Sequence, residues 1–148
     1  MTTEPRTTPS APIPSESLLR RGTRALVAIS FAAVGILHFL NPAPFVAIVP
    51  PWLPAPLALV LVSGFFEVLG GVGLLVPRVR KAAGIGLLVL LAAVYPANIQ
   101  MAVNEVYLPE MPHEPWLLWA RLPFQFVFAA LVAFAAGLWP FRQTSPRI

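Results

Sequence analysis

The sequence contains no cysteine, and this absence excludes several classes of function at once. Disulfide exchange, thiolate metal centres and cysteine nucleophiles all need a sulfur atom that this chain does not provide. Charged residues are scarce as well: they make up 11% of the 148 residues, about half the share found in soluble domains. The two histidines lack metal-ligand spacing, so the sequence predicts no metal site.

Apolar residues are abundant instead, at 57% of the chain, and they are gathered into long blocks. Blocks of this length are typical of transmembrane helices, which places the chain in contact with a lipid bilayer. The sequence predicts an all-α fold, a four-transmembrane-helix bundle that occupies residues 20–141. The predicted spans are residues 25–40, 56–76, 82–103 and 116–140.

The remaining segments are rich in proline or in small polar residues. The stretch 41–56, "NPAPFVAIVPPWLPAP", is apolar but too short and too proline-rich to span, so it predicts a short interfacial segment between the first two spans. Residues 1–19 are rich in Thr, Ser and Pro and predict a disordered tail. Residues 142–148 form a second short tail.

The basic residues indicate the orientation of the chain. Nine of the ten Lys and Arg residues lie near the N-terminus, in the segment 77–81 or near the C-terminus. The positive-inside rule then predicts that both termini are cytoplasmic. No helix collects the basic residues into one stripe, so a nucleic-acid partner is not expected.

A few polar or ionisable side chains interrupt the spans and form the candidate site. These candidates are His38, Glu67, Tyr95, Asn98, Arg121 and Gln125. A rise of roughly 1.5 Å per residue places most of them in the outer half of the membrane, with Glu67 beneath them near mid-depth. Charged groups inside a membrane usually face the bundle interior and pair with each other. We therefore expect one outward-facing polar pocket with contributions from all four helices.

Glu67 has small residues one helical turn away on either side, among them Gly64 and Gly71. Small residues let a neighbouring helix approach closely, so Glu67 is expected to face inward. Arg121 is the preferred counter-charge, with His38 and Gln125 next. Three alternatives stay open: the Glu67–Arg121 pair is structural, Arg121 extends to the outer headgroups, or His38 bonds a loop carbonyl.

Four segments together resemble the DoxX-like family of small bacterial membrane proteins. They are "GILHFLNPAPFVAIVPPWLPAP", "SGFFEVLGGVGLLVPRVRKAAGIGLL", "YPANIQMA" and "RLPFQ", and the resemblance covers about residues 25–136. It implies a four-helix bundle in the cytoplasmic membrane. The name-giving member of that family is a subunit of a thiosulfate:quinone oxidoreductase.

The resemblance and the polar side chains together lead to one preferred function. We expect a membrane subunit or stand-alone component of a quinone-linked redox system, at most a membrane subunit of an oxidoreductase. Arg121 and Asn98 would hydrogen-bond the oxygens of a small lipophilic or anionic ligand such as a quinone, and His38 and Glu67 would exchange protons with it. A soluble or membrane redox enzyme is the expected partner. The alternatives are a non-catalytic scaffold for a partner enzyme and the transport of protons or small molecules.

Overall fold

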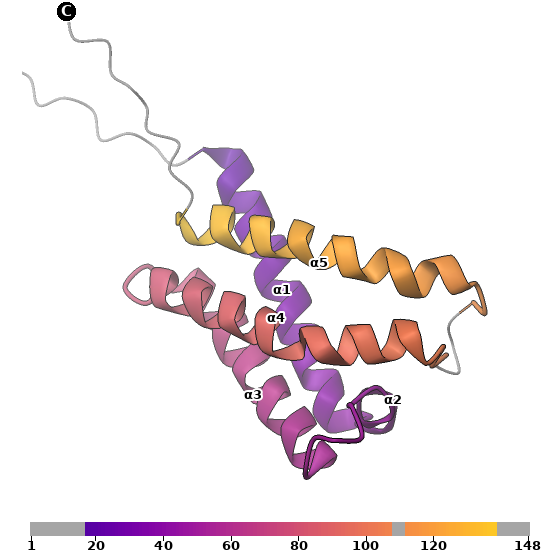
Figure 1. Cartoon of the computed structure of the whole chain (residues 1–148). Coiled ribbons are helices and arrows are strands. Elements are labelled where there is room, and N and C mark those ends of the chain that lie inside the picture. The colour runs from indigo at the N-terminus through magenta and orange to yellow at the C-terminus, as the bar shows by residue number, and fades with distance from the viewer. Residues whose placement is uncertain (1–16, 108–111, 139–148) are drawn as a thin grey trace, which may run out of the picture.

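The computed structural model describes residues 17–107 and 112–138, and the regular structure in these ranges is entirely helical. The helices are α1 (Leu18–Leu40), α2 (Ala43–Ala47), α3 (Pro56–Leu75), α4 (Arg80–Val103) and α5 (Pro115–Ala136), as Figure 1 shows. All except α2 are long and apolar enough to cross a membrane. This result confirms the predicted all-α bundle and describes a multi-pass membrane protein.

Helix α1 begins earlier than the sequence predicts. The side chain of Ser17 caps it by accepting a hydrogen bond from the backbone N–H of Arg20, at 3.3 Å. Leu18 and Leu19, which were expected in a disordered tail, are therefore helical. Arg20, Arg21 and Arg24 lie inside the helix rather than before it. A capped helix keeps its internal hydrogen bonds in water as well as in lipid, so it extends beyond the apolar block. The rest of that tail, residues 1–16, and the segment 142–148 lie outside the described residues.

The connection between α1 and α3 contains the short helix α2, which has five residues. Pro56 and Pro115 stand at the first turns of α3 and α5, where the missing N–H would have had no helical partner. Helix α5 ends at Ala136, because Gly137 adopts a left-handed conformation with φ of 74°. The helix is thus shorter than the predicted span 116–140, whose last two residues lie outside the described part.

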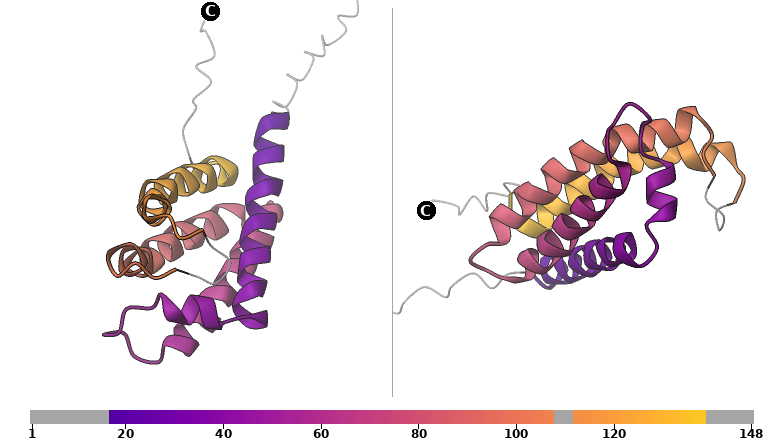
Figure 2. Two further views of the ribbon diagram at one scale, coloured as in Figure 1. Left: turned by 90° about the vertical axis from the view of Figure 1, so that its right-hand side faces the viewer. Right: turned by 90° about the horizontal axis from the view of Figure 1, so that it is seen from below.

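The four long helices form two antiparallel pairs. Helix α3 packs mainly on α1 and also on α4, while α5 packs mainly on α4 and also on α1. Figures 1 and 2 show that the α4–α5 pair lies across the α1–α3 pair. Helices α3 and α5 are therefore not close neighbours, and this arrangement decides which polar side chains can meet.

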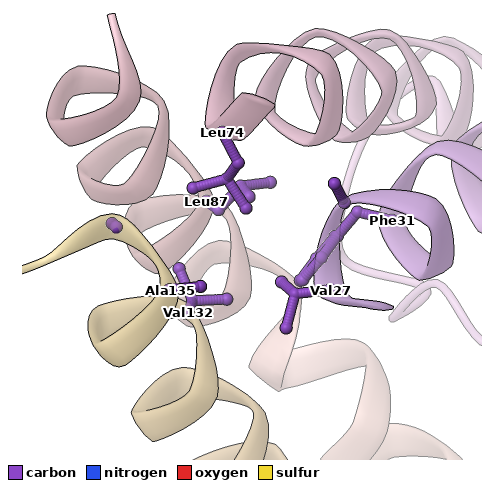
Figure 3. Close-up of a cluster of buried hydrophobic side chains, with 8 residues drawn as sticks. Val27, Phe31, Leu74, Leu87, Val132 and Ala135 are labelled. Carbon is purple, nitrogen blue, oxygen red and sulfur yellow. The ribbon is translucent and has the colours of Figure 1, made fainter. Parts of the chain in front are cut away.

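A hydrophobic core joins all four helices near the end of the bundle where α1 begins and α5 ends. Phe31 of α1, Leu74 of α3, Leu87 of α4 and Val132 of α5 meet there, as Figure 3 shows. By contrast, only 11% to 28% of the residues in the most apolar stretch of each long helix are buried inside the protein. The remaining surface carries many exposed Leu, Val and Phe side chains, which suit contact with lipid tails.

Candidate functional site

Glu67 occupies the face of α3 that packs most closely on α1. A methyl group added at Gly64 would lie 2.5 Å from Cβ of His38, and one added at Gly35 would lie 2.6 Å from the carbonyl oxygen of Gly64. Gly71 approaches the backbone of Ala28 in the same way. The expectation that small residues turn Glu67 inward is therefore consistent with the structure, where only 8% of Glu67 is exposed.

The partner that the structure gives Glu67 is His38. The Oε2 atom of Glu67 lies 3.3 Å from Nδ1 of His38, and His38 is itself buried. The same Nδ1 atom lies 3.0 Å from the carbonyl oxygen of Val34, one turn earlier in α1. Among the described residues, Oε2 has no hydrogen-bond partner of good geometry. A buried carboxylate oxygen without a hydrogen bond is unusual in a folded protein and calls for a specific explanation.

The preferred Glu67–Arg121 pair is not the arrangement that the structure shows. Arg121 lies on α5, which is not a close neighbour of α3, and its Nη1 atom contacts the sulfur of Met101 at 3.3 Å. Depth along a helix can be estimated from sequence, but the order of helices around a bundle cannot. His38, the second choice, lies on the helix that packs most extensively on α3.

A second polar group lies between α4 and α5. The Nδ2 atom of Asn98 donates to Oε1 of Gln125 at 2.6 Å, and Nε2 of Gln125 donates to the carbonyl oxygen of Leu91. Leu91 lies next to Ala92, whose carbonyl loses its helical donor because of Pro96. Gln125 is therefore held from both sides, and it connects the two helices beside the proline interruption.

A cavity of about 700 Å³ opens beside this polar group. Asn98, Arg121 and Gln125 all line it, and Trp116 and Phe124 contribute aromatic walls. The structure therefore brings three of the six predicted side chains to one cavity. It is formed by α4 and α5, however, and His38 and Glu67 do not line it.

Tyr95 is the remaining predicted site residue. Its ring meets the ring of Phe126 edge-on, with 5.8 Å between the ring centroids, and it does not line the α4–α5 cavity. In the described part of the chain, no group of three or more His, Cys, Asp or Glu side chains is placed to share a metal ion. The six candidates therefore separate into the His38–Glu67 pair, the Asn98–Arg121–Gln125 group and Tyr95.

The sequence did not reveal that two basic residues bond the ends of other helices. Arg24 is buried, and its Nε atom donates to the carbonyl oxygen of Ala135 near the end of α5, at 3.0 Å. Arg80 donates in the same way to the carbonyl oxygen of Leu74 near the end of α3, at 3.1 Å. Basic groups at helix C-termini satisfy free carbonyls and oppose the helix dipole. These arginines therefore hold the bundle together, in addition to any effect on topology.

A family model described as "Domain of unknown function (DUF8561)" matches residues 27–136. The chain belongs to this family. The matched region runs from the first half of α1 to the last residue of α5, so it includes every candidate site residue. No curated protein and no solved structure matches the chain.

Proposed function

We propose that this protein binds a quinone in the α4–α5 cavity and serves as a membrane component of a redox system of the DoxX type. The observation that carries the proposal is the group of three polar side chains, Asn98, Arg121 and Gln125, on the wall of an otherwise apolar and aromatic cavity. Ligand sites usually have this composition, with a few polar groups that orient a mostly apolar molecule.

The chemistry of the lining suits a quinone head group. Its ring carbonyl oxygens accept hydrogen bonds, and the guanidinium of Arg121 has several N–H donors. The amide of Asn98 keeps a second N–H after donating to Gln125. Trp116 and Phe124 offer aromatic surfaces to the ring, and the volume of about 700 Å³ lies in the usual range for small-molecule sites.

The quinone, when bound, supplies the redox chemistry, while the side chains of the protein bind and orient it. Electrons are exchanged with a partner oxidoreductase, consistent with the resemblance of the chain to the DoxX-like family. The resemblance to the DoxX-like family supports a location in a bacterial plasma membrane, and the basic residues support an orientation with both termini on the cytoplasmic side. In that orientation the loop between α4 and α5 faces outward, and Trp116 marks the outer end of the cavity.

Quinone binding can be measured through the fluorescence of Trp116, which lies in the cavity wall. The full chain in lipid nanodiscs is titrated with decylubiquinone, and empty nanodiscs give the background from partition into lipid. We expect saturable quenching, weaker affinity in Arg121→Met and Asn98→Leu, and unchanged affinity in Phe66→Leu, a substitution on an exposed surface of α3. Trp116→Phe should remove most of the quenching amplitude. Non-saturable quenching, or equal affinities in all variants, would refute the proposal.

A further inference from the structure

A second cavity, of about 320 Å³, lies between α1, α3, α4 and the connection that contains α2. It shares no lining residue with the α4–α5 cavity. Its walls are almost entirely apolar, and the two polar side chains that line it are His38 and Ser63. Phe45 covers His38 from the α2 side, with 3.8 Å between the ring centroids. A ligand in this cavity would thus meet one imidazole in an apolar surrounding.

The backbone fixes which ring nitrogen of His38 carries the proton. A carbonyl oxygen only accepts hydrogen bonds. The hydrogen bond of 3.0 Å between Nδ1 and the carbonyl oxygen of Val34 therefore requires a proton on Nδ1. In the neutral ring, Nε2 then keeps a lone pair and acts as an acceptor. Nε2 has no hydrogen-bond partner among residues 17–107 and 112–138. It is also not fully enclosed, because in these ranges the one enclosed side-chain polar atom without a partner is Oε2 of Glu67.

Glu67 is the acidic side chain next to His38. Its Oε2 atom lies 3.3 Å from Nδ1, the same ring nitrogen that contacts the carbonyl oxygen of Val34. Opposite charges at this distance attract each other more strongly where water is excluded. The other elements around His38 contribute only apolar or neutral side chains to the cavity, such as Phe45 from α2 and Pro96 from α4. Glu67 is therefore the one described charge that faces His38.

We propose that this cavity binds small lipophilic phenols and takes up their hydroxyl proton. The O–H bond of the phenol breaks, its proton forms an N–H bond with Nε2 of His38, and the electron pair stays on the phenolate oxygen. No electron is transferred. The product is a row of alternating charges: phenolate, imidazolium and the carboxylate of Glu67. His38 is the base in this scheme, and Glu67 is a positioning residue. The proposal does not depend on the quinone site, because the two cavities share no lining residue.

The test uses 4-nitrophenol, whose phenolate absorbs at a longer wavelength than its neutral form. The probe is titrated into the full chain in nanodiscs at a pH below its own pKa, with empty nanodiscs as background. We expect a saturable phenolate band in the unaltered protein. In His38→Gln the band should be lost. In Glu67→Gln the probe should bind as the neutral phenol, because the imidazolium loses its counter-charge, and a purely structural role for Glu67 would not change the spectrum in this way.

Two further variants separate a loss of the site from a loss of folding. Ala97→Phe fills part of the cavity while leaving His38 and Glu67 in place, and it should abolish the band without lowering the unfolding temperature much. Phe66→Leu, on an exposed surface of α3, should retain the band. The proposal is overturned if the unaltered protein binds only neutral phenol, or if the phenolate band persists in His38→Gln or in Ala97→Phe.

Discussion

Replacement of Gly64 by Ala tests the packing that brings His38 to Glu67. The added methyl group would lie 2.5 Å from Cβ of His38 and 2.9 Å from the carbonyl oxygen of Gly35. Carbon atoms in contact are optimally about 3.5–4.0 Å apart, so α1 and α3 must separate by about 1 Å or more. Neither contact can yield by a simple rotamer change, because one atom belongs to the backbone and the other is a Cβ.

The expected destabilisation follows from this displacement. Insertion of a methyl group into a well-packed site costs about 1–3 kcal/mol, and a gap of about 0.5–1 Å between other atoms of the interface forfeits a quarter to a half of their dispersion energy. Gly64→Ala should therefore reduce the free energy of unfolding by about 1–3 kcal/mol. The separation should also weaken the contact between His38 and Glu67 and, with it, the phenolate band of 4-nitrophenol.

Gly86→Ala is the matched control. It lies inside α4, and a methyl group there would meet no atom within 4 Å. Alanine favours a helix over glycine by about 1 kcal/mol, so this variant should be as stable as the unaltered chain or more stable. Both variants are unfolded by SDS titration in mixed micelles, with circular dichroism as the readout. If Gly64→Ala is as stable as Gly86→Ala, the close approach of α1 and α3 described above is wrong.

Three further predictions concern the rest of the bundle. Arg24→Ala should lower the free energy of unfolding by about 1.5–3 kcal/mol, since it removes a charged hydrogen bond to the end of α5. Arg78→Ala, on the exposed turn, should change the free energy of unfolding by less than about 0.5 kcal/mol. Equal effects of the two substitutions in the same SDS titration would contradict the role of Arg24. A double-mutant cycle with Asn98→Ala and Gln125→Ala should give a coupling of about 0.6 kcal/mol and at most about 1.7 kcal/mol, and strictly additive effects would argue against their hydrogen bond. The chain has no cysteine, so in intact cells a membrane-impermeant maleimide should label Asn104→Cys but not Arg78→Cys, and the reverse pattern would invert the proposed orientation.

The sequence is sufficient to predict the helices because burial in lipid imposes one requirement along the whole chain. Each backbone group in the membrane must find an internal partner, so long apolar blocks become helices, and prolines and basic residues separate them. The boundaries on the aqueous side are less predictable. Helix α1 extends back to Leu18 because the Ser17 cap and the docking of Arg24 on α5 stabilise its first turns, and neither effect depends on hydropathy.

The helix face that some candidate residues share was predictable, whereas the partner of Glu67 was not. The turn spacing of Arg121 and Gln125 places them on one face of a helix, and the structure brings both to the same cavity as Asn98. The partner of Glu67 depends instead on which helices are neighbours. Which helices are neighbours follows from close contacts such as the one between Gly35 of α1 and Gly64 of α3. The spacing of residues within one helix does not show which residue of another helix they will contact.

Photoaffinity labelling with an azidoquinone tests the proposed quinone site most directly. The full chain in nanodiscs is irradiated with the probe, with and without excess decylubiquinone, and the labelled peptides are identified by mass spectrometry. We predict labelling that decylubiquinone suppresses, centred on the stretch from Trp116 to Phe128 of α5 and on the part of α4 around Asn98. Labelling that excess decylubiquinone does not suppress, or that is confined to α1 and α3, would contradict a quinone site between α4 and α5.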